Sequence, residues 1–157
     1  MKLITGVLLL LTFFSTSANA ISINVPKGLI DVGLAKKFPR EKLTISLDKP
    51  TTRFSKERQK IELCGIWANK ISKQNGDFCI DFQPVWSKAK GDIEITKVNL
   101  LKLTTSDGNE LPASFSAALN STVLTLLDGT SVYHAPEMVG KVLERIEVQE
   151  SSIRLVF

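Results

Sequence analysis

The sequence predicts an α+β domain, with an antiparallel sheet and helices packed on one side of it. Between residues 43 and 104, hydrophobic residues recur mostly at every second position, which is the spacing of half-buried strands. In residues 26–37 and 111–127, and again from Pro136, the spacing changes to three and four, which is typical of helices. Strands grouped in the middle, with one helix before them and two after, are characteristic of this class.

The first twenty residues are expected to be a signal peptide rather than part of the fold. Lys2 is their only charge, residues 7–14 are mostly apolar, and Ala18-Asn19-Ala20 has the small-x-small pattern of a cleavage site. Cleavage after Ala20 would release residues 21–157 into the periplasm as a single exported domain. The apolar run is too short to span a bilayer, and no cysteine lies near the cleavage site, so we expect no stable membrane anchor.

Charge and length exclude several broad classes of protein. The chain has 157 residues and a formal net charge of +4 at pH 7, and acidic residues are interspersed among its basic ones. This pattern indicates a solvated surface, so we expect no nucleic-acid partner. The processed length is that of one domain with a core of its own.

The first elements are short and end at prolines. Residues 21–25 alternate as a short strand, and Pro26 opens a helix that ends at Phe38-Pro39, because the residue before a proline avoids helical angles. A half-buried strand follows at residues 43–48, and Lys49-Pro50 turns the chain.

Two strands, residues 61–69 and 77–86, are expected to pair as a hairpin around residues 70–73. Their hydrophobic residues share one face, which places Cys64 and Cys79 side by side on the opposite face. In an oxidising compartment these cysteines are expected to form a disulfide, which stabilises by about 3 kcal/mol for a loop of this size. Two cysteines with one histidine make a poor zinc site, so no metal is expected.

The next strand, residues 92–104, changes face along its length. Ile93 and Ile95 alternate, whereas Leu100 and Leu101 are adjacent. This shift predicts a bulge or bend, which would help the sheet to curve.

The helix predicted at residues 111–127 carries no charged residue. An ordinary surface helix has Lys, Glu or Arg opposite its hydrophobic stripe, whereas this one has Ala, Ser, Asn, Thr and Leu there. We therefore expect it to be enclosed on most sides, or to face something other than water. Two interpretations stay open: a buried core helix, or a helix that lines a groove for an apolar ligand.

The C-terminal part is expected to hold a short strand at residues 131–134, a helix from Pro136, and a hairpin of residues 146–148 and 153–157. The last strand of this hairpin would offer a sheet edge to a partner strand.

No catalytic frame is visible. His134 is the only histidine, no Gly-x-Ser-x-Gly or phosphate-binding glycine motif occurs, and the carboxylates occur singly. We therefore expect no enzyme activity, no catalytic residue and no cofactor. An enzyme would need His134 or Tyr133 beside a carboxylate in a cleft.

Several segments resemble the YceB-like family, small exported bacterial proteins of uncharacterised function. They are the opening VPKGLIDVGLAKKFPR, the strand ending LDKP, the amphipathic helix before TSVYH, and the closing IEVQESSIRLVF. The family is similar in fold to the tubular lipid-binding (TULIP) superfamily. The resemblance therefore implies a strongly curved antiparallel β-sheet wrapped around a long apolar helix, with shorter N-terminal and C-terminal helices. Two features depart from the family: the missing lipidation cysteine and the Cys64–Cys79 pair.

The leading hypothesis is a periplasmic protein that binds a lipid or other apolar ligand in a groove between helix 111–127 and the sheet. The alternative is a non-enzymatic envelope protein-interaction or assembly factor with a filled core. The residues expected to line the groove are Leu111, Phe115, Leu119, Val123 and Leu126 from the helix, and Leu63, Trp67, Ile80, Phe82, Ile93 and Ile95 from the sheet.

Overall fold

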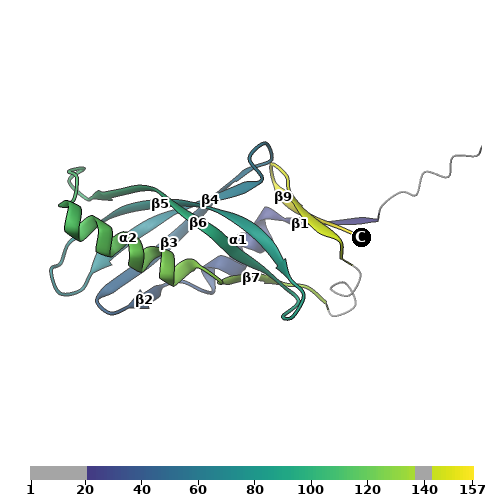
Figure 1. Cartoon of the computed structure of the whole chain (residues 1–157), viewed down its shortest axis with the longest axis horizontal. Helices are drawn as coiled ribbons and strands as arrows, with labels where there is room; N and C mark the ends of the chain where they lie inside the picture. The colour runs from purple at the N-terminus through teal and green to yellow at the C-terminus, as the bar shows by residue number, and fades with distance from the viewer. Residues whose placement is uncertain (1–20, 137–142) are drawn as a thin grey trace, which may run out of the picture.

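The computed structural model describes residues 21–136 and 143–157, which form two antiparallel sheets and two helices (Figure 1). The strands are β1 (Ser22–Pro26), β2 (Arg40–Lys42), β3 (Ile45–Ser55), β4 (Lys60–Asn69), β5 (Asn75–Ser87), β6 (Asp92–Thr105), β7 (Ser131–His134), β8 (Arg145–Val148) and β9 (Ser152–Val156), and the helices are α1 (Lys27–Ala35) and α2 (Ala113–Leu127). The larger sheet has the order β2-β3-β4-β5-β6-β7, and the smaller sheet has the order β1-β9-β8.

The larger sheet curls into a half-barrel (Figure 1). Register shifts interrupt the β3–β4, β5–β6 and β6–β7 pairings, and such irregularities bend strands. On β6, Leu100 and Lys102 have direct partners on β5, whereas Leu101 between them has none. The bulge predicted at Leu100 and Leu101 is therefore confirmed.

The expected wrapping of a strongly curved sheet around a long apolar helix is wrong. The described residues are mostly strand, and α2 is a helix of 15 residues that contacts β6 on one flank and β2 and β3 on the other (Figure 1). Only one face of α2 is buried, and Ala117, Ser121 and Thr125 on its outer face are exposed. A lack of charge did not indicate enclosure here, because small Ala, Ser and Thr side chains also form a solvated face.

The C-terminal helix expected from Pro136 falls on residues 137–142, which lie outside the described residues, as does the signal peptide expected at residues 1–20. Among the residues that the structure describes, no helix has the length and apolar character needed to cross a membrane.

The helix predicted after Pro26 is confirmed as α1, which contacts β3 and β7. Ile30 and Leu34 are its buried residues. Gly33 lies so close to β7 that a Cβ atom there would stand 2.0 Å from the carbonyl oxygen of Val132. Glycine is therefore needed at this position, because any other side chain would push the helix away from the strand.

The smaller sheet places the C-terminal strand β9 at its centre, between β1 and β8. The terminal hairpin is confirmed, but the expectation that its last strand is a sheet edge is wrong, and Ile153 and Leu155 are buried. The side-chain amide of Gln59 ties this sheet to the larger one. It accepts a hydrogen bond from the Val148 N–H (2.8 Å) and donates one to the Val148 carbonyl (3.0 Å).

The predicted disulfide between Cys64 and Cys79 is present. The two residues lie directly opposite each other in the β4–β5 register, with their Cα atoms 4.1 Å apart. Both are half-buried, whereas the neighbouring Leu63, Phe78 and Ile80 are fully buried on the other face of the sheet. The disulfide therefore lies on the outer, convex face of the half-barrel.

Candidate functional site

The residues predicted to line a groove come together in one hydrophobic cluster between α2 and the larger sheet. Leu63 lies directly opposite Ile80 in the β4–β5 register, and all the predicted sheet residues are completely buried. From α2, Leu119, Val123 and Leu126 are buried in the same cluster. The sheet residues of this cluster that were predicted are Leu63, Trp67, Ile80, Phe82, Ile93 and Ile95.

The N-terminal end of α2 is covered less tightly. Leu111 and Phe115 are only partly buried, although both pack against the cluster. The Phe115 ring lies 6.1 Å from the Trp67 ring with a tilt of 54°, which is a favourable aromatic arrangement. The indole N–H of Trp67 donates a hydrogen bond to the Thr104 carbonyl at 2.9 Å. A separate hollow of about 430 Å³ at this end of β4 and β5 is lined by residues of these two strands and by Ser106, and not by α2.

On its β2 flank, α2 is pinned to the sheet by Arg40. The guanidinium donates two hydrogen bonds to the Leu126 carbonyl, at 3.2 and 2.8 Å, and a longer one of 3.4 Å to the Thr130 hydroxyl. Carbonyl groups in the last turn of a helix lack intrahelical partners, and a cation there also interacts favourably with the helix dipole. Arg40 therefore fixes the C-terminal turn of α2 to the edge strand β2.

On the β6 flank, the sheet has no further strand beyond Ile95 among the described residues. β7 pairs with Asp92–Glu94, and backbone hydrogen bonds from Ile95 to Thr130 and from Gly129 to Ile95 end the ladder. We call the gap between the rest of β6 and α2 the β6–α2 seam. A hollow of about 440 Å³ lies in it, lined by Lys97, Val98, Leu124, Thr125 and Asp128.

The seam has an apolar floor and a polar rim. Val98 and Leu124 are partly buried, while Lys97 and Asp128 are exposed and carry opposite charges. Asn120 lies one turn before Leu124, and its side-chain oxygen is buried without a hydrogen-bond partner among the described residues. Such an oxygen raises the free energy of the protein unless a ligand or water supplies a donor. Ligand pockets are usually mostly apolar with a few polar groups, and this hollow falls within their range of volumes.

Val98 and Leu124 are not among the residues predicted from the sequence to line the groove. Val98 reaches the seam because Lys97 has a left-handed backbone with a φ of 50°, beside a register shift between Asp81 and Gln83 of β5. Leu124 lies beside the main apolar stripe of the helix. The available signal was its hydrophobic character on a helix flank that has no charge.

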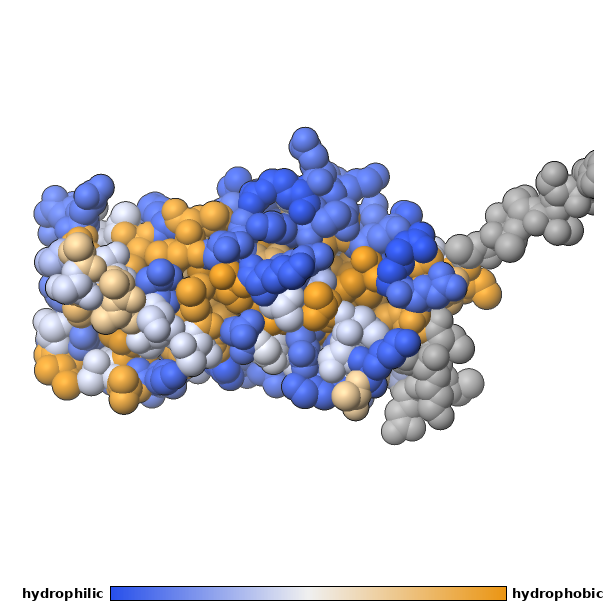
Figure 2. Space-filling view, viewed as in Figure 1, coloured by the Kyte–Doolittle hydropathy of each residue, from blue (hydrophilic) through white to orange (hydrophobic). Residues whose placement is uncertain are grey.

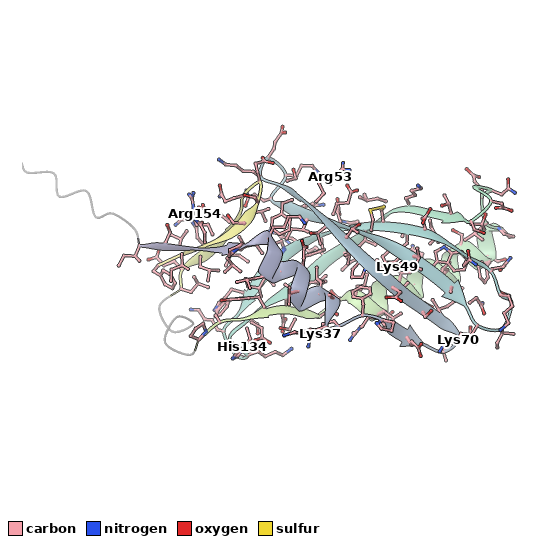
Figure 3. The ribbon with its side chains drawn as sticks, turned by 180° about the vertical axis from the view of Figure 1, so that it is seen from behind. Lys37, Lys49, Arg53, Lys70, His134 and Arg154 are labelled. Carbon is pink, nitrogen blue, oxygen red and sulfur yellow. A yellow bond between two sulfur atoms is a disulfide. The ribbon has the colours of Figure 1, made fainter. Side chains whose placement is uncertain are left out.

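His134 of β7, labelled in Figure 3, forms a polar pair with Asp92, which lies opposite it on β6. The imidazole Nδ1 lies 2.5 Å from the carboxylate. Burial raises the pKa of Asp92, but the hydrogen bonds from His134 and Ser131 outweigh burial and hold that pKa below its ordinary value. The His134 side chain is 68 % exposed, so this pair lies at the surface of the protein.

Asp81 is a buried carboxylate on the convex face, and its partners surround it. It accepts hydrogen bonds from Arg58, from Lys60 at 3.3 Å and from Asn99 at 3.1 Å. Burial raises the pKa of Asp81, but these three partners outweigh burial and lower that pKa below its ordinary value. Glu62 stands next to the disulfide, whose bonded sulfurs offer no thiolate to a metal ion. This side of the sheet is therefore occupied by its own ion pairs.

No protein-family model and no curated protein matches this chain. The candidate site is therefore defined by geometry alone. The hollow in the seam combines an apolar floor with a charged rim, and the unpartnered Asn120 oxygen lies one helical turn from Leu124 rather than in its lining.

Proposed function

We propose that this protein binds a lipid or another apolar ligand in the β6–α2 seam and the hydrophobic cluster behind it. The observation that carries the proposal is the hollow of about 440 Å³ where β6 has α2, and not a strand, as its neighbour. A hydrocarbon chain entering there would contact Val98 and Leu124. The buried oxygen of Asn120 would accept a hydrogen bond from a polar group of the ligand.

The attachment of α2 supports the same proposal. Its C-terminal turn is held by Arg40 and by the backbone hydrogen bonds at Ile95, whereas its N-terminal end packs through Phe115 on Trp67. The hollow lies beside this held C-terminal turn, so its two walls would keep their spacing and offer a preformed site to a ligand.

Export to the periplasm is part of this proposal, and the Cys64–Cys79 disulfide is compatible with an oxidising compartment. Membership of the YceB-like family, with the lipid role that its fold analogy implies, is likewise proposed from the segments quoted above. The proposed binding involves no chemical reaction, so a non-enzymatic role is part of the same proposal and stays a prediction.

Native mass spectrometry of protein purified without detergent tests ligand binding. We expect a co-purified acyl species and uptake of a fluorescent fatty acid. Leu124→Lys should reduce uptake at least about tenfold, because it places a charge on the apolar floor of the seam. Ala118→Lys is the matched control, since Ala118 is exposed on the same helix and lies away from the residues that line the hollow. Neither an acyl species nor uptake in the unaltered protein would overturn the proposal.

The second candidate function is binding of a protein partner at the edge of the smaller sheet. β1 is an edge strand, and Ile21 and Ile23 beside and within it are 71 % and 46 % exposed. A partner strand would extend the sheet there by backbone hydrogen bonds. Cross-linking in cells should then capture a partner, and Ile23→Lys should abolish the capture. Equal capture by this variant would exclude β1 as the docking edge.

A further inference from the structure

Two hydrophobic side chains project into solvent at the end of the larger sheet that lies far from the smaller sheet. Leu43, between β2 and β3, is 89 % exposed, and Ile71, between β4 and β5, is 77 % exposed. Single exposed apolar residues are common on proteins and need no special explanation. Leu43 differs from that background in its backbone conformation, and the two turns that carry these side chains lie next to each other.

The local backbone does not favour a leucine at position 43. Its φ of 55° lies in the left-handed region, which Gly or Asn adopts more readily than a bulky side chain. The Leu43 side chain neither fills the core nor suits its turn. A contact outside the folded chain would explain its presence, since unfavourable backbone conformations concentrate at functional positions.

The turn that carries Ile71 is likewise built by other residues. The side-chain oxygen of Asn69 accepts hydrogen bonds from the backbone N–H groups of Ile71 (3.0 Å) and Ser72 (3.2 Å). The N–H of Lys73 donates to the Asn69 carbonyl at 3.0 Å. Asn69 therefore shapes the turn, and the Ile71 side chain is not needed to hold it.

Hydrogen bonds and an ion pair join the two turns into one surface, which we call the apolar tip (residues 40–44 and 69–75). The N–H of Lys70 donates to the Thr44 carbonyl at 2.8 Å, and the Lys70 ammonium pairs with Glu41 at 2.8 Å. Figure 1 shows both turns at the same end of the sheet, and Figure 2 shows hydrophobic surface at that corner of the molecule.

The apolar tip contains three lysines. Lys42 and Lys73 are exposed beside the two turns, and Lys70 lies at the same end (Figure 3). Glu41 is the acidic residue of the tip, and it is already paired with Lys70. Exposed apolar side chains with lysines beside them fit a surface that presents acyl chains below a layer of phosphates.

We propose that the apolar tip docks this protein reversibly onto the surface of an anionic lipid bilayer. Leu43 and Ile71 insert between the headgroups, and the lysines lie at the lipid phosphates. Two side chains give weak binding, which is distinct from a stable anchor. Docking does not depend on ligand binding in the β6–α2 seam, because neither side chain lines that hollow.

Vesicle flotation tests the proposal, with the processed chain that begins at Ile21. The vesicles are phosphatidylcholine with one third phosphatidylglycerol, and phosphatidylcholine alone is the neutral comparison. We expect binding to the anionic vesicles that weakens as salt is added, and weaker binding to the neutral ones. Lys73→Gln should reduce binding to the anionic vesicles about fivefold, since one lysine near such a surface contributes about that factor.

Leu43→Asn separates docking from folding. It should weaken vesicle binding about tenfold, while the melting temperature stays the same or rises, because asparagine suits a positive φ. Ile71→Asn should weaken binding to a similar extent. The control is Leu101→Asn, which changes a leucine on β6 that is 47 % exposed, and should leave binding unchanged.

Three results would overturn the proposal. One is the absence of binding by the unaltered protein to anionic vesicles. Another is an equal loss of binding in Leu43→Asn and Leu101→Asn. The third is a concentration-dependent dimer that Leu43→Asn dissociates, because a second copy of the chain would then cover the tip.

Discussion

The two flanks of α2 meet the same sheet in opposite ways. On the β2 flank, Arg40 fixes the last turn of the helix by hydrogen bonds. On the β6 flank, a hollow lies between Val98 and Leu124. A helix with one buried face can close tightly against one edge of a half-barrel and leave the other edge only loosely covered. The contrast teaches that stability and ligand access can be assigned to different sides of one helix.

The packed cluster beneath α2 should carry a larger share of stability than the seam. Trp67→Ala removes a fully buried ring, its contact with Phe115 and its hydrogen bond to Thr104, and should lower the free energy of unfolding by about 4 kcal/mol. Val98→Ala in the seam should cost about 1 kcal/mol or less, because Val98 is only partly buried. Urea unfolding measures both values. Similar costs at the two positions would contradict the assignment.

Removal of the disulfide should reduce stability without affecting the seam. The double variant Cys64→Ser/Cys79→Ser should lose about 3 kcal/mol, because the unfolded chain regains the freedom of the closed loop. Fatty-acid uptake by the folded variant should stay unchanged, since the disulfide lies on the convex face. Thermal unfolding and uptake are measured on the same samples. A folded variant that has lost uptake would refute the prediction that the disulfide affects stability but not ligand binding.

Arg40→Ala should loosen the pinned flank. It removes the hydrogen bonds to the Leu126 carbonyl and should cost about 1.5 kcal/mol, with faster hydrogen exchange in the last turns of α2. Arg53→Ala on β3 is the control, because that arginine is exposed. If both variants exchange at the same rate, Arg40 does not pin the helix.

The smallest effect on stability is expected for Asp92, which lies where β6 pairs with the short strand β7. The pKa of Asp92 is held below its ordinary value, so its pairing with His134 and Ser131 stabilises the protein at neutral pH. That contribution is lost as the pH falls below about 4, the usual range of an aspartate. Asp92→Asn should therefore cost about 1 kcal/mol at pH 7 and nothing at lower pH, where the wild-type carboxyl is protonated. Urea unfolding of both proteins across this pH range checks the prediction. A stability difference between them that does not change with pH would contradict it.

Local patterns in the sequence predict those parts of the fold that local interactions determine. The helix after Pro26, the β4–β5 hairpin with its disulfide, and the bulge at Leu101 all follow from short-range periodicity. The central place of β9 does not, because Ser22 finds its partner at Val156 across most of the chain. The predicted enclosure of α2 is wrong, since an uncharged face is compatible both with burial and with small solvated side chains.

The candidate site also has a part that local sequence patterns predict and a part that depends on tertiary structure. The inward residues of the strands and the stripe of α2 could be predicted, and they do gather in one cluster. The position of the seam could not be predicted, because it depends on where β7 stops pairing with β6 and on the backbone turn at Lys97. Val98 and Leu124 become neighbours of one hollow only through these two tertiary features.

The pairing of β1 with β9 has a consequence for the order of folding. The first described strand has its hydrogen-bonding partner in the last one, so this pair must close a loop that contains the whole half-barrel. Such distant contacts form slowly unless intervening structure has already brought the two ends together. The half-barrel supplies this help through Gln59, which binds the backbone of β8. Until β9 enters between its neighbours, β1 and β8 expose unpaired edges, so a delay in this last step is the period when other chains can add to them.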